Sequence, residues 1–225
     1  MSNSVDLAAE YVLLVLDDDK GGFRQDLTTV DFTVAAAELA CLVRDDVLAF
    51  DSSREGLPFL CAGHRAARDE LHEEIVHRCL GKTCDQAIAA LASPFGKQPH
   101  TARSLREHVV ERLVGSGVLT TRRDRLLGII PRTRYPQADG VPEVELRGRL
   151  MSVFNGAEPD EDTGVLIALL DAGHALSQAF PGLTRDQLRR GHEIAEGRWP
   201  GEGLRRAFAQ QAAYMAQTST IGVSY

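Results

Sequence analysis

The chain has 225 residues, enough for one large domain or two small ones that each bury a core of their own. Its content of 44% hydrophobic and 25% charged residues is typical of a soluble globular protein, and no apolar run approaches the roughly 20 residues needed to span a bilayer. The net charge of −7 opposes diffuse binding to nucleic acid or lipid, because contacts with phosphates require concentrated positive charge, so any anion site must be local.

The first half of the chain shows helical periodicity interrupted by one short hairpin. A first helix is predicted over residues 7–16 and ends at the polar, glycine-containing stretch 17–22. Asp26 or Thr28 is a suitable N-cap for a second helix that extends to about Arg44. The next segments predict a hairpin formed by Val47–Asp51 and Pro58–Cys61, and helices at about 65–80 and 84–92.

The second half begins with another helix and another hairpin. Thr101 is a plausible N-cap for a helix over 102–115 that ends at glycines. Val118–Thr121 and Leu126–Ile130 predict the two strands of a hairpin, joined by the turn Arg122–Arg125. Further helices are predicted at 142–155, 163–179, 185–196 and 202–216.

These elements predict a mostly α fold, a single-domain helical bundle surrounded by amphipathic helices, with two short β-hairpins. A capping box, Thr184 with Gln187, supports the start of one late helix. No linker rich in Pro, Gly or Ser divides the chain, so residues 1–225 are expected to form one domain. Its ordered core is expected over about 6–217, followed by a loose tail. Residues 1–11 contain no Lys or Arg and do not resemble a signal or transit peptide.

Sequence patterns associated with catalysis or metal binding are absent. His72 and His77 are five residues apart, which on a helix turns the second imidazole about 140° from the first. The aspartates at 17–19 lack the alternating spacing of a calcium loop, and there is no GxSxG or phosphate-binding glycine motif. We therefore expect no metal, no cofactor and no enzyme activity. We also expect free structural thiols at Cys41, Cys61, Cys79 and Cys84.

The segment from His100 to Tyr135 is basic in an otherwise acidic chain. It holds eight arginines and three acidic residues, a local charge of +5, so the remainder of the chain carries −12. Arg103 and Arg106 are spaced so that, in the first turn of the predicted helix, both side chains project from one face. Two guanidinium groups could then bind one anion beside the free N–H groups of the helix start. The alternative is an exposed basic turn.

The apolar residues of the second hairpin lack strict alternation, so both faces of its strand would be apolar. They are Leu126, Leu127, Ile129 and Ile130. Either both faces are buried in a core or a subunit interface, or one face meets lipid. In the second case the flanking arginines could each contribute about 1 kcal/mol near an anionic leaflet, giving weak and reversible binding. These arginines are Arg122, Arg123, Arg125, Arg132 and Arg134.

Three long blocks, taken together, resemble the Golgi phosphoprotein 3 family in its bacterial branch. They are DDDKGGFRQDLTTVDFTVAAAELACLV, LREHVVERLVGSGVLTTRRDRLLGIIPRTRYP and TGVLIALLDAGHALSQAF, within a similarity that extends from about Tyr11 to Phe208. The resemblance implies a mostly α-helical fold. It also implies peripheral membrane binding through the headgroup of phosphatidylinositol 4-phosphate.

The resemblance also implies particular site residues. Two arginines of the family's headgroup pocket correspond to Arg103 and Arg106. A family Trp corresponds to Arg24, and another family Arg corresponds to Thr33, so half of the pocket differs. We expect an anion pocket with altered selectivity. The family's apolar hairpin, used for membrane contact or self-association, corresponds to Leu126–Ile129, whereas the Arg-rich N-terminal tail of eukaryotic relatives has no counterpart in residues 1–11.

Three functions compete at this point. The first is a cytoplasmic, peripherally membrane-associated protein that binds an anionic phospholipid headgroup through Arg24, Arg103 and Arg106, with Thr33 beside them. Its membrane contact would use Leu126, Leu127, Ile129, Arg122 and Arg123. The second is a soluble adaptor or homo-oligomeric scaffold that uses the hairpin for self-association and the arginines for acidic protein partners. The third is an enzyme acting on a phosphorylated small molecule. No nucleic-acid partner is expected.

Overall fold

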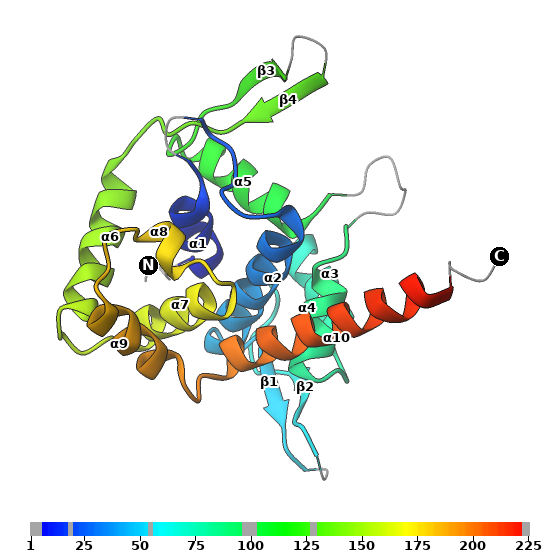
Figure 1. The fold of residues 1–225 in the computed structure, drawn as a ribbon. Helices are drawn as coiled ribbons and strands as arrows, with labels where there is room; N and C mark the ends of the chain where they lie inside the picture. Colours follow the sequence, from blue (N-terminus) through cyan, green and yellow to red (C-terminus); the bar gives the residue numbers. More distant parts are fainter. Residues whose placement is uncertain (1–5, 18–19, 54–55, 96–102, 127–129, 222–225) are drawn as a thin grey trace.

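The computed structural model describes residues 6–17, 20–53, 56–95, 103–126 and 130–221. Within them the chain forms ten helices and two separate antiparallel strand pairs (Figure 1). The helices are α1 (Leu7–Val15), α2 (Leu27–Arg44), α3 (Glu70–Cys79), α4 (Cys84–Leu91), α5 (Leu105–Gly115), α6 (Val141–Phe154), α7 (Glu161–Ala172), α8 (Leu176–Ala179), α9 (Arg185–Ala195) and α10 (Trp199–Ile221). The strands are β1 (Leu48–Asp51), β2 (Phe59–Ala62), β3 (Arg122–Leu126) and β4 (Ile130–Arg134).

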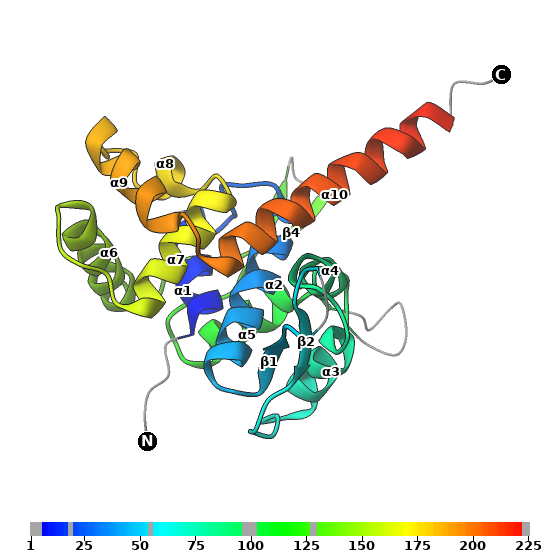
Figure 2. The ribbon, with the colours of Figure 1, turned by 90° about the horizontal axis from the view of Figure 1, so that it is seen from below.

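The centre of the molecule is built from helices that are apolar on every side. Ala8, Tyr11 and Leu14 of α1 are fully buried, and α2 is buried without a break from Phe32 to Leu42. A helix that is apolar all round must be enclosed by other elements. The remaining helices supply that enclosure around α1, α2 and α7 (Figures 1 and 2). The predicted mostly α fold with two short hairpins is confirmed.

Several helix starts follow from local capping. The Asp26 carboxylate accepts a hydrogen bond from the Thr29 N–H at 2.9 Å, as predicted for the second helix. The predicted box of Thr184 and Gln187 is also present at the start of α9. These contacts satisfy backbone N–H groups that have no partner inside the helix, and therefore fix where the helix begins.

Three predicted helices have different bounds. The helix expected from about 65 begins only at Glu70, because Asp69 caps it by accepting from His72 N–H. The segment 163–179 is two helices, α7 and α8, separated at Gly173 and His174, and His174 has a left-handed φ of 55°. The last helix continues to Ile221, past the point where a loose tail was expected. Its distal part projects away from the body of the protein (Figures 1 and 2).

The predicted start of the helix at 102 is wrong. Helix α5 begins at Leu105, where Ser104 and Glu107 form a capping box. The backbone of Arg103 instead pairs with Phe95 in an isolated antiparallel bridge. Arg103 therefore lies before the helix, and only Arg106 lies in its first turn. The predicted N-cap, Thr101, lies outside the described residues.

The predicted strand bounds of the second hairpin are also wrong. Arg122 and Arg123, expected in a turn, lie in β3 and pair with Arg134 and Thr133 of β4. The last described pair is Leu126 with Ile130, so the strands run towards residues 127–129. The first hairpin agrees with the prediction, since β1 pairs with β2 from Leu48 opposite Ala62 to Asp51 opposite Phe59.

Candidate functional site

Three segments distant in sequence meet beside the start of α5. Tyr135, just after β4, donates its N–H to the carbonyl of Gly21 at 2.8 Å. Gly21 has a positive φ of 61°, and a Cβ atom there would lie 2.5 Å from the nitrogen of Pro136, so only glycine fits. The next aromatic residue, Phe23, lies under Arg106, whose Cζ is 5.4 Å from the ring centroid. The segment 20–24 is thus held against both α5 and the base of the second hairpin.

Arg106 is held by an internal carboxylate. Its Nε donates to Oδ1 of Asp31, on α2, at 2.9 Å, and the two side chains are only 14% and 20% exposed. Burial raises the pKa of the Asp31 carboxyl, although Arg106 acts in the opposite direction. This pair therefore joins α5 to α2 and occupies part of the donor capacity of Arg106.

Arg103 also has a carboxylate partner, but in a much more open place. Its guanidinium pairs with Glu111 of α5, eight residues further along the chain, and the side chains are 53% and 56% exposed. Both arginines, with Glu107 and Glu111, contribute to the electrostatic surroundings of the Tyr135 phenol, whose pKa is raised mainly by burial. Arg103 and Arg106 are thus each paired with a different acid, Glu111 and Asp31 respectively.

Arg24 is exposed and reaches in another direction. Its Nη1 lies 3.5 Å from the carbonyl oxygen of Gln178, on α8. The neighbouring Gln25 is fixed at both ends, because it accepts from the Tyr11 hydroxyl and donates to the Gly173 carbonyl, each at 2.6 Å. These partly buried hydrogen bonds fix the position of the backbone next to Arg24.

Thr33 has no exposed surface. Its hydroxyl donates to the carbonyl of Thr29 within α2, and its side chain is 0% exposed. A Cβ atom on Gly173 would lie 2.9 Å from the Thr33 hydroxyl oxygen, so the side chain is tightly enclosed. The expectation that Thr33 contacts a headgroup is therefore not met in this structure.

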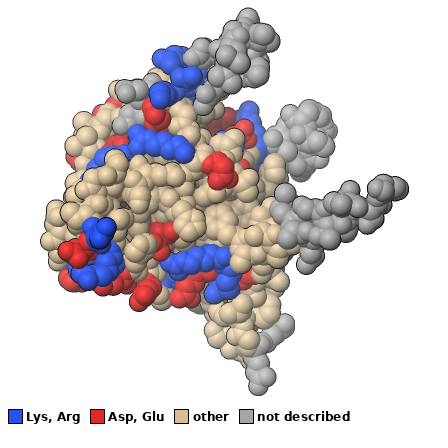
Figure 3. Space-filling view, viewed as in Figure 1, with Lys and Arg blue, Asp and Glu red and all other residues tan. Residues whose placement is uncertain are grey.

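The second hairpin has basic residues at its base, and the apolar residues of its sequence lie between them. Arg122, Arg123 and Thr133 are exposed, and Arg134 reaches the carbonyl of Lys20 at 3.4 Å. Basic side chains lie at the base of this hairpin and on the adjoining surface (Figure 3). Leu126 is the last residue of β3, whereas Leu127 and Ile129 lie outside the described residues.

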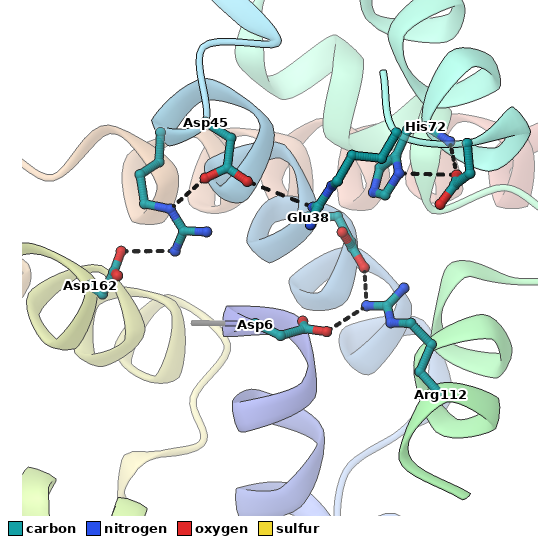
Figure 4. Close-up of polar contacts among 9 residues, drawn as sticks. Asp6, Glu38, Asp45, His72, Arg112 and Asp162 are labelled. Carbon is teal, nitrogen blue, oxygen red and sulfur yellow. Dashed lines mark hydrogen bonds and ion pairs between the residues drawn. The ribbon is translucent and has the colours of Figure 1, made fainter. Parts of the chain in front are cut away.

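A second arginine-centred contact lies at the other end of α5. Arg112 donates from Nη2 to Glu38 at 2.6 Å and to Asp6 at 2.9 Å, and so joins α5, α2 and the cap of α1 (Figure 4). Glu38 is only 3% exposed. Burial alone would lower the pKa of Arg112, but the two carboxylates raise it above its usual range. This arginine is a structural link.

Within the described residues, the structure offers no grouping of His, Cys, Asp and Glu suited to a metal ion. His72 is buried with its Nδ1 3.0 Å from Asp69, whereas His77 is exposed, so they do not converge. In the described part of the chain, Cys41, Cys61, Cys79 and Cys84 form no disulfide. No helix in the described ranges is long and apolar enough to cross a membrane.

Comparison with known proteins adds one match. The model of a family described as Golgi phosphoprotein 3 (GPP34) matches residues 7–211. The match begins with the first residue of α1 and ends within α10, so it includes Arg24, α5 and the second hairpin. No curated protein matches the chain.

Proposed function

This chain belongs to the Golgi phosphoprotein 3 (GPP34) family, which is known for association with Golgi membranes, and from that premise we propose that it is a non-enzymatic, peripheral membrane protein. Its ligand is an anionic phospholipid headgroup, by family resemblance that of phosphatidylinositol 4-phosphate. The family is not a family of enzymes, and the proposal assigns the chain a binding role alone.

The observation that carries this proposal is the composition of the β3–β4 hairpin. Its described strands present exposed Arg122 and Arg123, and they lead to the sequence Leu126-Leu-Gly-Ile129. Apolar residues that enter the outer part of a bilayer, next to arginines that pair with lipid phosphates, give reversible membrane binding. The acidic remainder of the chain would restrict that attraction to this side of the protein.

Headgroup recognition is assigned to Arg24, Arg103 and Arg106. The Arg103 pair with Glu111 is more than half exposed on both sides, and ion pairs of this kind are weak and exchange readily. Arg106 contributes charge from a fixed position, because Asp31 and the Phe23 ring hold it. Arg24 supplies a third positive charge from the segment 20–24, and to join the other two it must turn from the Gln178 carbonyl on α8.

Vesicle flotation with the purified chain tests this proposal. Binding to phosphatidylcholine vesicles should rise when phosphatidylinositol 4-phosphate or another anionic lipid is included, and should weaken in salt. The variant Arg24→Ala/Arg103→Ala should bind at least about tenfold more weakly, because charge-assisted hydrogen bonds are lost. The matched control is Arg185→Ala/Arg189→Ala, which removes two exposed arginines from α9. Equal flotation of the two double variants would refute the headgroup assignment.

A further inference from the structure

Arg103 is already neutralised in the free protein, and any ligand must displace its partner. Glu111 provides one carboxylate with one negative charge, and it lies on α5, which begins two residues after Arg103. Because Glu111 belongs to the same chain as Arg103, their pairing costs no translational entropy, and the effective concentration of the carboxylate at Arg103 is high. A ligand with a single negative charge therefore gains little binding free energy when it replaces the Glu111 carboxylate.

Phospholipid headgroups differ in this respect. A phosphodiester, as in phosphatidylglycerol, carries one negative charge. A phosphate monoester carries about −1.5 to −2 at neutral pH and three acceptor oxygens. The monoester therefore offers Arg103 more than a carboxylate does, and its additional oxygens can accept from a second guanidinium such as that of Arg106.

We propose that Glu111 is a specificity-determining residue of the headgroup site. Its carboxylate occupies Arg103 in the free protein and shifts the binding preference towards lipids whose headgroup bears a phosphate monoester. This inference rests on the proposed function, because it concerns the selectivity of the same site.

The surroundings of the two acids indicate that Glu111 is the one displaced. Its side chain is 56% exposed, so after leaving Arg103 it can remain hydrated. Asp31 is only 20% exposed, and losing Arg106 would leave a partly buried carboxylate without its cation. Asp31 thus holds Arg106 in place, while Glu111 exchanges with the ligand.

The test compares two lipids at equal vesicle surface charge. Phosphatidic acid supplies a monoester and phosphatidylglycerol a diester, each in phosphatidylcholine vesicles at neutral pH. The wild-type chain should bind the phosphatidic acid vesicles more tightly. Glu111→Gln should increase binding to phosphatidylglycerol by up to about fivefold, the range expected of an exposed ion pair, and reduce the preference for phosphatidic acid.

Glu193→Gln is the matched control, because it removes the same charge from another exposed, helical glutamate. Glu193 lies on α9, 63% exposed, with Arg189 as its ion-pair partner. A general gain from reduced negative charge would appear equally in both variants and leave the lipid preference unchanged.

The outcomes separate this inference from the proposed function. Equal binding of wild type to both lipids, or an unchanged preference in Glu111→Gln, would overturn the role of Glu111 and leave membrane binding intact. Failure to bind either lipid would overturn both proposals. Both proposals would be supported if Glu111→Gln reduces the preference for phosphatidic acid and Glu193→Gln leaves it unchanged.

Discussion

Arg112 and Arg103 lie on neighbouring parts of one chain segment, yet their partners give them different roles. Glu38, which pairs with Arg112, is almost completely buried, whereas the partner of Arg103 is largely in solvent. A buried carboxylate cannot regain water when its cation leaves, so its arginine becomes part of the fold. An exposed pair costs little to separate, so Arg103 is available to a ligand.

Replacing Arg112 with Met tests the structural role. The aliphatic stem is preserved, but Glu38 loses its ion pair at 2.6 Å. We expect the free energy of unfolding to fall by about 1–3 kcal/mol, because a buried polar group loses its partner. Urea denaturation followed by circular dichroism measures this change. Arg189→Met, at an exposed arginine of α9, should alter the stability by no more than about 0.5 kcal/mol. A loss as small as that of the control would show that Glu38 does not depend on Arg112.

At the scale of the element, local signals were predictable and long-range partners were not. The cap at Asp26 and the box at Thr184 involve residues three positions apart, so the sequence displays them directly. The same signal, Ser104 with Glu107, marks the start of α5, whereas the predicted cap is Thr101. Asp31 and Arg106 are 75 positions apart, and no sequence pattern connects them.

The strand bounds of the second hairpin could not be predicted, for a related physical reason. Strand β3 has the sequence Arg-Arg-Asp-Arg-Leu, which has no alternation of apolar and polar residues. Its pairing places Arg122 opposite Arg134, and like charges opposite each other oppose strand pairing. The residue pattern therefore predicts a turn here. A nearby anionic surface would reduce this repulsion, in agreement with the proposed membrane contact.

Helix α10 depends on glycine for its close approach to α4. A Cβ atom at Gly203 would lie 2.3 Å from the sulfur of Cys84, whereas one at Gly148 on the surface of α6 would meet nothing within 4 Å. Gly203→Ala should therefore lower the free energy of unfolding by about 1–3 kcal/mol through overpacking. Gly148→Ala should instead raise it by about 0.5–1 kcal/mol, because alanine favours helix.

A double-mutant cycle identifies the source of the stability loss expected for Gly203→Ala. Cys84→Ala removes the sulfur and leaves only the Cβ atom of residue 84, which lies 3.3 Å from the added methyl group. Gly203→Ala should therefore cost less in the Cys84→Ala background than in the wild type, as measured by urea denaturation. Equal costs in both backgrounds would show that the sulfur is not the source of the strain.

At the scale of the whole molecule, the two strand pairs lie at opposite ends of the helical body (Figure 1). The β3–β4 end lies within the basic segment 100–135, whereas the rest of the chain carries −12. A charge distribution of this kind favours approach to an anionic surface by the basic end, because the rest of the chain is negative on balance. The same hairpin could serve self-association, and this is the alternative that the membrane proposal must exclude.

Replacing Leu126, Leu127 and Ile129 with Ser distinguishes the two uses of the hairpin. If the apolar residues enter the bilayer, flotation with anionic vesicles should fall at least about tenfold, because the loss of several buried CH₂ groups at about 0.8 kcal/mol each removes that much affinity. The particle size in light scattering should stay that of the wild type. The matched control is Leu57→Ser, at a 46% exposed leucine in the turn between β1 and β2, which should leave flotation unchanged. A smaller particle with undiminished vesicle binding would instead assign the hairpin to a subunit interface and the protein to the adaptor class.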